Sequence, residues 1–122
     1  GLLQIMRPTA AAIATRLDLP SDARSLARPE ISVRIGARYL GDLARRYDPS
    51  PALVPSAYNA GQGAVDRWLR LRRDLPLDAF IEEIPYGETR RYTRRVLMSR
   101  GIYEWLREGE LPRLPLDTPS RT

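Results

Sequence analysis

Residues 57–61 of this chain read Ala-Tyr-Asn-Ala-Gly, and the pair Tyr58-Asn59 is the most chemically specific feature in the sequence. A carboxamide donates and accepts hydrogen bonds, which suits the N-acetyl group of an amino sugar, and a phenol ring can cover a sugar face. Gly61 is a typical C-terminal stop for a helix, so we expect the pair at a helix end that points into a cleft. The structural alternative makes Asn59 a helix cap and Tyr58 a core residue.

A second polar group lies in the first segment, Gly-Leu-Leu-Gln-Ile-Met, where Gln4 and Met6 precede a predicted helix. Gln4 offers one acceptor and two donor hydrogens, which suit sugar hydroxyls and amides, so the segment can form one wall of a ligand groove. Taken by itself, the segment favours a plainer interpretation: a packed loop in which Gln4 satisfies backbone groups.

Two adjacent acids, Glu82 and Glu83, interrupt the apolar run 77–84. An unpaired carboxylate is costly to bury, and adjacent positions face different ways on a helix, so one of the two can point into a cleft. The alternative is that both are solvated or pair with Arg90 and Arg91. We assign Glu88 a structural role, because an acid is favoured near a helix N-terminus.

Composition narrows the chemistry further. The sequence has 122 residues and contains neither histidine nor cysteine, so it excludes His-based catalysis, His or thiolate metal sites and disulfides. Acid–base chemistry must therefore use carboxylates or tyrosine, and we expect no metal and no cofactor. No apolar run approaches the roughly 20 residues of a transmembrane helix.

All 20 basic residues are arginine, and the net charge is +5. Arg90, Arg91, Arg94 and Arg95 recur at helical spacing, which raises the hypothesis of an arginine-rich nucleic-acid binder. No known nucleic-acid motif surrounds them, so this is the weaker hypothesis and no nucleic-acid partner is expected. Solvated helix faces in a GC-rich genome are the favoured explanation of the arginine bias.

Periodicity and breakers predict an all-α domain. The expected helices cover residues 10–17, 29–47, a stretch ending at 60, 63–73, a short piece within 77–84, and 88–107, with 18–28 as a loop. Thr9 and Ser50 are expected to cap helices, and Gly36 to allow a close helix–helix approach. Pro55 indicates that its helix starts late or is kinked.

Two of the expected helices have a clear inward face. For residues 29–47 the inward-facing residues are Ile31, Ile35, Tyr39, Leu40, Leu43 and Tyr47. For residues 88–107 they are Tyr92, Val96, Leu97, Tyr103 and Leu106. Residues 108–122 form a Pro-rich tail, mobile or packed as a strap through Leu111, Leu114 and Leu116.

Four motifs occur together in one order: Gly-Leu-Leu-Gln-Ile-Met at 1–6, Arg-Pro-Glu-Ile-Ser-Val-Arg-Ile-Gly-Ala-Arg-Tyr-Leu at 28–40, Ala-Tyr-Asn-Ala-Gly-Gln-Gly-Ala-Val at 57–65, and Ile-Glu-Glu-Ile-Pro-Tyr-Gly-Glu-Thr-Arg-Arg-Tyr at 81–92. This combination resembles the catalytic domain of the soluble lytic transglycosylases, which are lysozyme-like enzymes that cleave peptidoglycan. The resemblance runs from residue 1 to about Leu106. It implies residues 1–107 as a partial transglycosylase domain, followed by the tail 108–122.

The resemblance also implies the site and the reaction. Gln4, Met6, Tyr58, Asn59 and Glu82 fall on glycan-contacting positions of a groove. In the family, one Glu protonates the oxygen between N-acetylmuramic acid and N-acetylglucosamine, then activates the C6 hydroxyl to give a 1,6-anhydro product. No residue of this chain matches that Glu, which the resemblance places upstream of Gly1.

Three expectations follow for the protein as a whole. The isolated chain should show little or no lytic activity, its partner should be peptidoglycan glycan strands, and its location the periplasm or cell envelope. The alternative is a non-catalytic glycan-binding module that keeps the groove without the acid.

Overall fold

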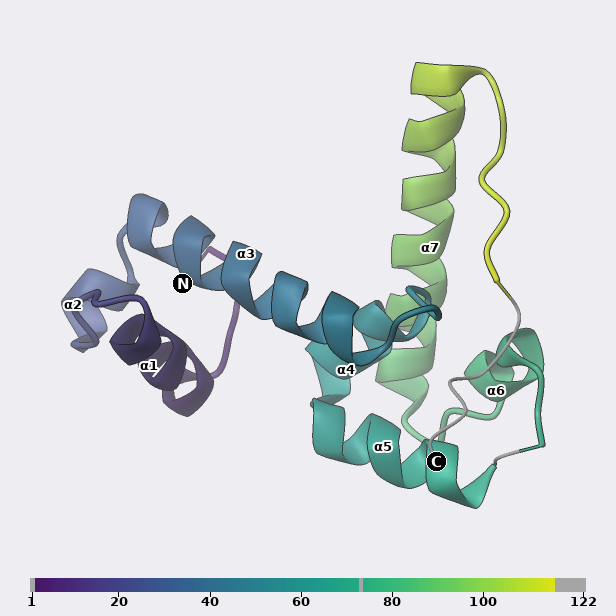
Figure 1. Cartoon of the computed structure of the whole chain (residues 1–122), viewed down its shortest axis with the longest axis horizontal. Coiled ribbons are helices and arrows are strands. Elements are labelled where there is room, and N and C mark those ends of the chain that lie inside the picture. Colours follow the sequence, from purple (N-terminus) through teal and green to yellow (C-terminus); the bar gives the residue numbers. More distant parts are fainter. Residues whose placement is uncertain (1, 73, 116–122) are drawn as a thin grey trace. The chain divides into compact units, whose positions relative to one another are not determined.

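The computed structural model describes residues 2–72 and 74–115, and within these ranges the chain has seven helices and no strand (Figure 1). The all-α prediction is therefore confirmed. None of the helices in this part of the chain combines the length and the hydrophobicity needed to cross a membrane. The predicted helix end at Arg73 and the predicted strap contact of Leu116 lie outside the described residues. The helices are α1 (Arg7–Arg16), α2 (Ala23–Leu26), α3 (Pro29–Arg46), α4 (Leu53–Ala60), α5 (Gln62–Leu71), α6 (Leu77–Glu82) and α7 (Gly87–Glu108).

The chain divides into two compact units, Gly1–Asp42 and Leu43–Thr122. In the first unit, α1 and α2 pack together, and α1 contributes its apolar face to a core shared with the first part of α3. The residues of this core are Ala10, Ile13, Ala14, Ile31 and Ile35, with Ile5, Leu17, Leu19, Leu26 and Tyr39 packed around them. The spacing of Ile31 and Ile35 predicts this face correctly, because residues four apart lie one above the other on a helix.

Two local predictions in the first unit are wrong. Thr9 does not cap a helix, because α1 begins two residues earlier at Arg7 and Pro8 occupies its first turn. Residues 18–28 are not all loop: Asp22 caps the short α2 by accepting a hydrogen bond from the Ser25 backbone N–H at 3.0 Å. Both errors concern helix starts, where a proline without an N–H or a single capping carboxylate decides the boundary.

Gly36 does mark a close approach, but the neighbour is not the predicted second helix. The side chain of Leu3 lies against its Cα, in the space that a Cβ would occupy. The segment 2–6 therefore packs directly on α3 because position 36 has no side chain.

In the second unit, the core is built from the apolar faces of α4 to α6 and the end of α3. Its buried members include Leu43, Tyr47, Leu53, Ala57, Val65, Trp68, Leu77, Phe80 and Ile84. Leu40, also predicted to face inward, is 43% exposed.

A buried polar cluster joins the end of α3 to α5. The Tyr47 hydroxyl donates to Asp66 Oδ1 at 3.0 Å, and the Arg46 guanidinium donates to Asp66 Oδ2. Asp66 and Tyr47 are both buried. A carboxylate in such a place is tolerable only because its oxygens are hydrogen-bonded and its charge is paired. The cluster also shifts the titration of its members: burial, reinforced by the charge of Asp66, raises the pKa of the Tyr47 phenol, and the hydrogen bond to Asp66 raises the pKa of Arg46.

Helices α4 and α5 are joined through a single residue, Gly61. Its φ of 86° lies in the region that favours glycine, and its backbone N–H donates to the Ala57 carbonyl at 2.9 Å. The predicted stop at Gly61 is thus confirmed. Pro55 falls in the first turn of α4, where the missing N–H costs no intrahelical bond, so this helix starts late as expected. Ser50 does not cap α4; Ala52 holds that position without a side-chain bond.

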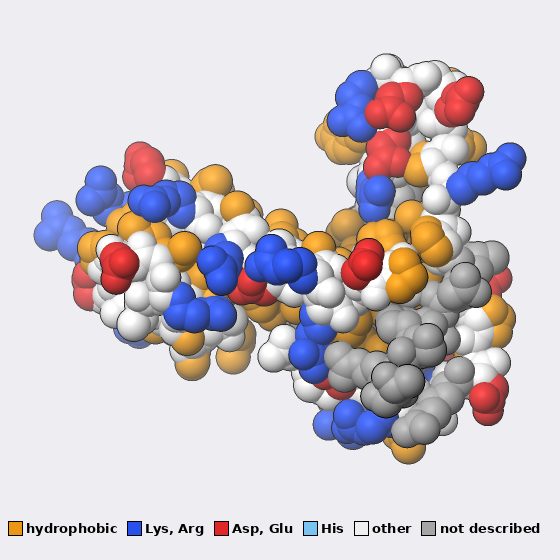
Figure 2. Space-filling model, viewed as in Figure 1, with side chains coloured by type: hydrophobic (Ala, Val, Ile, Leu, Met, Phe, Trp, Pro, Cys, Tyr) orange, Lys and Arg blue, Asp and Glu red, His pale blue; other side chains and the backbone are white. Residues whose placement is uncertain are grey.

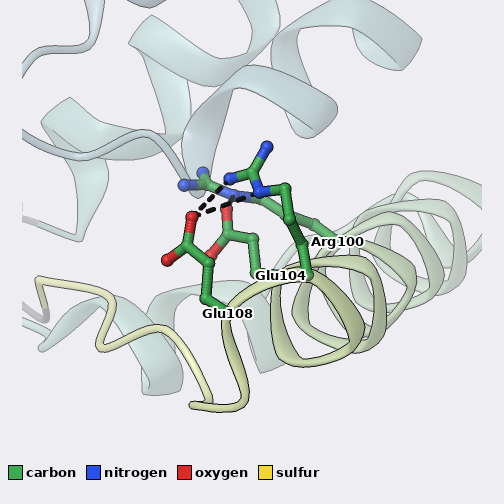
Figure 3. A network of polar contacts seen from close by, with 4 residues as sticks. Arg100, Glu104 and Glu108 are labelled. Atoms are coloured by element: carbon green, nitrogen blue, oxygen red, sulfur yellow. Dashed lines mark hydrogen bonds and ion pairs between the residues drawn. The ribbon is translucent and has the colours of Figure 1, made fainter.

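The longest helix, α7, packs against α4 and α6 through its first half. Its buried residues are two threonines, Thr89 and Thr93. Its second half extends beyond the other helices of this unit (Figure 1), and Tyr103 and Leu106, predicted to face inward, are 74% and 67% exposed. Arg100–Glu104 and Arg107–Glu108 ion pairs, at 2.6 and 2.7 Å, line this part of the helix (Figure 3).

We expect Asp66→Asn to lower the free energy of unfolding by about 1–3 kcal/mol, because Arg46 and Tyr47 lose a charged acceptor in a buried setting. Urea denaturation measures this change. The matched control is Asp74→Asn, at an exposed turn position, for which we expect less than about 0.5 kcal/mol. Equal effects of the two substitutions would contradict a central role for the cluster.

The raised pKa of Tyr47 predicts a loss of stability in alkali. Above pH ~10 the unfolded chain releases phenol protons that the folded chain retains, so the free energy of unfolding falls as pH rises. Below pH ~10 the phenol is neutral in both states and this contribution is constant. Tyr47→Phe should therefore flatten the alkaline fall in urea titrations, whereas Tyr103→Phe, at an exposed position, should leave it unchanged.

Candidate functional site

Asn59 lies near the end of α4 with its side chain exposed and anchored at one atom. Its Oδ1 accepts a hydrogen bond of 2.6 Å from the hydroxyl of Thr89, a buried residue in the first turn of α7. The Asn59 NH₂ group, at the other branch of the carboxamide, has no hydrogen-bond partner within residues 2–72 and 74–115, so its two donor hydrogens can serve a ligand. The geometry therefore presents a fixed hydrogen-bond donor at the surface of the unit.

A second polar contact supports the first. Ser56, three residues before Asn59, shares a hydrogen bond of 2.9 Å with Thr93, four residues after Thr89. Both hydroxyls are fully buried, so their pairing avoids the cost of two unsatisfied groups. Two successive turns of α4 are thus linked to two successive turns of α7. These links fix the position of Asn59 along the axis of α7.

Tyr58 is half-buried next to Asn59, and two further aromatic side chains lie in the same unit. Trp68 of α5 meets Tyr86, the residue before α7, edge to face, with ring centroids 5.0 Å apart and planes at 84°. Half of Tyr86 remains exposed. The loop between α6 and α7 is therefore held against α5 by an aromatic pair in a favourable geometry.

Glu82 ends α6 and points outward. Its side chain is 58% exposed and forms an ion pair of 3.5 Å with Arg94 of α7. Arg90, one turn earlier on α7, donates instead to the backbone carbonyls of Glu82 and Ile84, at 3.3 and 3.2 Å. The partner of Glu82 is thus Arg94 and not Arg90 or Arg91, and Glu83 is exposed as well.

Asn59 and Glu82 are both tied to α7, but at different sides of it. Their partners Thr89 and Arg94 are five residues apart, which at about 100° per residue separates them by roughly 140° around the helix. Glu88, assigned a structural role, lies in the first turn of α7, where an acid complements the helix dipole.

Gln4 and Met6 belong to the first unit and precede α1. Both are exposed, and Met6 is the N-cap residue directly before α1. Gln4 has φ of 51°, an uncommon value for a residue other than glycine, and it lines a cavity of about 160 Å³ between its own segment and α1 to α3. Gln4 is thus exposed at a cavity, whereas the alternative interpretation made it a packed loop residue that satisfies backbone groups.

Arginines are dispersed among acids and do not gather in one patch on the face drawn in Figure 2. Within the cluster that raised the nucleic-acid hypothesis, Arg90 is engaged with backbone carbonyls and Arg94 with Glu82. These contacts give two of the four side chains structural partners inside the chain.

Sequence reasoning missed Thr89 and Thr93 as supporting residues. The signal that could have found them is their spacing: two small hydroxyl residues four apart, on a helix face that otherwise continues with Val96 and Leu97. Polar residues on a buried helical face need partners, and here Ser56 and Asn59 provide them.

Comparison with known proteins agrees with this architecture. The family model described as Transglycosylase SLT domain matches residues 1–81. The soluble lytic murein transglycosylase of Escherichia coli K12 is 34% identical over 117 residues, covering 93% of this chain and 18% of that protein. The Salmonella typhimurium soluble lytic murein transglycosylase is 36% identical over 107 residues, covering 84% of this chain and 16% of that protein.

A solved structure shows the same fold. It is an inactive mutant of the lytic transglycosylase Slt from Pseudomonas aeruginosa, with a TM-score of 0.79 and 35% identity over 93% of this chain and 19% of that one. The chain thus spans about a fifth of the length of these relatives. It belongs to the transglycosylase SLT domain family, with an all-α, lysozyme-like fold.

The link between Ser56 and Thr93 predicts energetic coupling. Thr93→Val should lower the free energy of unfolding by about 1–3 kcal/mol, because the Ser56 hydroxyl is left buried without a partner. The double variant with Ser56→Ala should cost less than the sum of the single changes. A double-mutant cycle in urea measures the coupling, and strictly additive costs would show that the hydroxyls do not interact.

Proposed function

We propose that this protein acts on peptidoglycan glycan strands as part of a lytic transglycosylase, and that this chain supplies glycan-binding groups. The proposal rests on one observation: within a chain of the SLT family, the Asn59 carboxamide is anchored through its oxygen by Thr89 at 2.6 Å and leaves its NH₂ group exposed. Such a donor complements the carbonyl oxygen of an N-acetyl group, which occurs on both sugars of the glycan strand.

The other predicted site residues have complementary roles in this proposal. Tyr58 covers a sugar face beside Asn59, and Gln4 and Met6 of the first unit contribute further glycan-contacting groups. Glu82 accepts hydrogen bonds from sugar hydroxyls. Its ion pair with Arg94 is exposed on both sides, and exposed pairs are worth little, so Glu82 can exchange this partner for a ligand at small cost.

The proposed reaction cleaves the β-1,4 bond between N-acetylmuramic acid and N-acetylglucosamine. A glutamic acid gives its proton to the bridging oxygen, the 2-acetamido group assists at the anomeric carbon, and the same carboxylate then takes the proton of the C6 hydroxyl as that oxygen bonds to C1. The nucleophile belongs to the substrate, so the mechanism needs one catalytic carboxylate, whereas common glycosidases need two. We place this glutamate outside residues 1–122, in keeping with the motif match. We propose the cell envelope as the site of action, because peptidoglycan lies there.

Binding of a peptide-free N-acetylglucosamine tetrasaccharide to the 122-residue chain tests the proposal. We expect saturable binding by calorimetry without cleavage, and about tenfold weaker binding for Asn59→Ala, as the loss of one hydrogen bond predicts. Gln62→Ala, an exposed amide three residues away, is the matched control and should bind normally.

Either of two results would count against the proposal: no saturable binding of the tetrasaccharide, or equal affinities of Asn59→Ala and Gln62→Ala. Release of anhydro products by the chain alone would contradict the placement of the catalytic glutamate.

A further inference from the structure

Helix α3 has a notch at Gly36, and the side chain of Leu3 fills it. A Cβ at position 36 would overlap with Leu3 Cδ1 and lie 3.3 Å from Leu3 Cγ, so any residue other than glycine would force Leu3 out of the notch. Glycine has a low helix propensity, and α3 continues on both sides of it. The glycine therefore serves the N-terminal segment and not the helix in which it lies.

Gln4, the residue after Leu3, has a strained backbone. Its φ of 51° lies in the left-handed region, which costs energy in a residue with a side chain. Among the described residues other than glycine, only Asp18 also has a positive φ, and aspartate adopts this region more readily than most residues. Glutamine has no such preference, so the surroundings of Gln4 must hold its conformation.

The neighbours of Gln4 on both sides are anchored to the first unit. Leu3 is half-buried in the notch of α3, and Ile5 is half-buried against the core shared by α1 and α3. The carbonyl of Met6 then accepts the Ala10 N–H at 2.9 Å, which joins the segment to α1. The exposed Gln4 is thus held between two packed apolar side chains and cannot relax without displacing one of them.

The carboxamide of Gln4 has no support of its own. Within residues 2–72 and 74–115 it has no hydrogen-bond partner, whereas Thr89 holds the carboxamide of Asn59. The position of the Gln4 carboxamide is therefore set by its backbone, and the backbone is held by Leu3 and Ile5. A backbone fixed in advance lowers the entropy that the side chain loses when it binds a ligand.

We propose that Gly36 is a positioning residue for Gln4: by seating Leu3, it fixes the backbone from which the Gln4 carboxamide reaches the glycan. Gly36 acts through Leu3 and makes no contact with the sugar. The proposal rests on the proposed function, which makes Gln4 a glycan-contacting residue. It adds the position on α3 that decides where this contact is made.

Binding of the tetrasaccharide to variants of the 122-residue chain tests this role by calorimetry. Gln4→Ala should weaken binding about tenfold, the effect of one lost hydrogen bond, and Gly36→Ala should weaken it by a similar factor. The double variant should bind no more weakly than Gln4→Ala alone, because both changes remove the same contact. Gly101→Ala, inside α7 with no atom within 4 Å of the added Cβ, is the matched control and should bind normally.

A second truncation should repair the first. Leu3→Ala empties the notch and should by itself weaken binding. Combined with Gly36→Ala it should bind more tightly than either single variant, because Leu3 Cβ lies 3.6 Å from the added Cβ, an ordinary van der Waals distance. A general loss of stability would not be repaired in this way. If Gly36→Ala prevents folding of the first unit, Leu3→Ala decides the question, because it leaves α3 unchanged.

The conformation of Gln4 can be measured without a ligand. A residue with positive φ gives an intense NOE between its own amide and α protons, because the two protons are close in that conformation. We expect this signal for Gln4 in the unsubstituted chain and in Gly101→Ala. It should weaken in Gly36→Ala and return when Leu3→Ala is added.

The outcomes separate this role from the function on which it rests. If Gln4→Ala weakens binding while Leu3→Ala and Gly36→Ala bind normally, the positioning role is overturned and the glycan function stands. Normal binding by Gln4→Ala, or losses that multiply when Gln4→Ala and Gly36→Ala are combined, also overturns the role. A Gln4 NOE that persists in Gly36→Ala overturns it whatever the binding result. No saturable binding by the unsubstituted chain overturns the glycan function, and the positioning role with it.

Discussion

The contact of α4 with α7 is the constraint on which the second unit depends. Its polar part consists of two links, Ser56 to Thr93 and Asn59 to Thr89, at 2.9 and 2.6 Å. Apolar contacts alone would tolerate a small slide of one helix along the other, because they have no direction. Hydrogen bonds between hydroxyl and amide groups do not tolerate such a slide, because a shift of either helix leaves buried groups unpaired. The same links that set the register of two helices therefore also orient the side chain proposed to meet the glycan.

The cluster of Arg46, Tyr47 and Asp66 has a comparable role between α3 and α5. It fixes the end of α3 to α5 by a carboxylate shared between a guanidinium and a phenol. The α6–α7 loop is secured separately, by the edge-to-face contact of Tyr86 with Trp68 and by the hydrogen bonds from Arg90 to two loop carbonyls. Each helix end near the proposed site thus has its own directional contact, in addition to a common apolar core.

Hydrophobic periodicity predicted the helices well because each helix buries one apolar face. In α3, for example, the predicted inward-facing residues Ile31, Ile35 and Leu43 are all buried. Helix starts were predicted less well, since single residues determine them: Asp22 caps α2 through one hydrogen bond, and Pro8, which has no N–H to leave unpaired, lies in the first turn of α1. The prediction for α7 was wrong at Tyr103 and Leu106 because a helical pattern gives a face but not how far along the helix its neighbours extend. The motifs identified the family and the residues proposed for the site. The partners that orient those residues, Thr89 and Arg94, required the three-dimensional structure, because they are 30 and 12 positions away from the residues they contact.

Gly61 ends α4 and begins α5, so no loop separates the two helices. A residue inserted into a longer loop is absorbed by local rearrangement of that loop. A residue inserted next to Gly61 would instead rotate the side chains of α4 by about 100° relative to those of α5. Asn59 would then leave Thr89, or Val65 and Trp68 would leave the core. The distance in sequence between the site and the core of α5 is therefore fixed. Insertions and deletions in related sequences should therefore fall in other connections, such as the exposed stretch that follows α7.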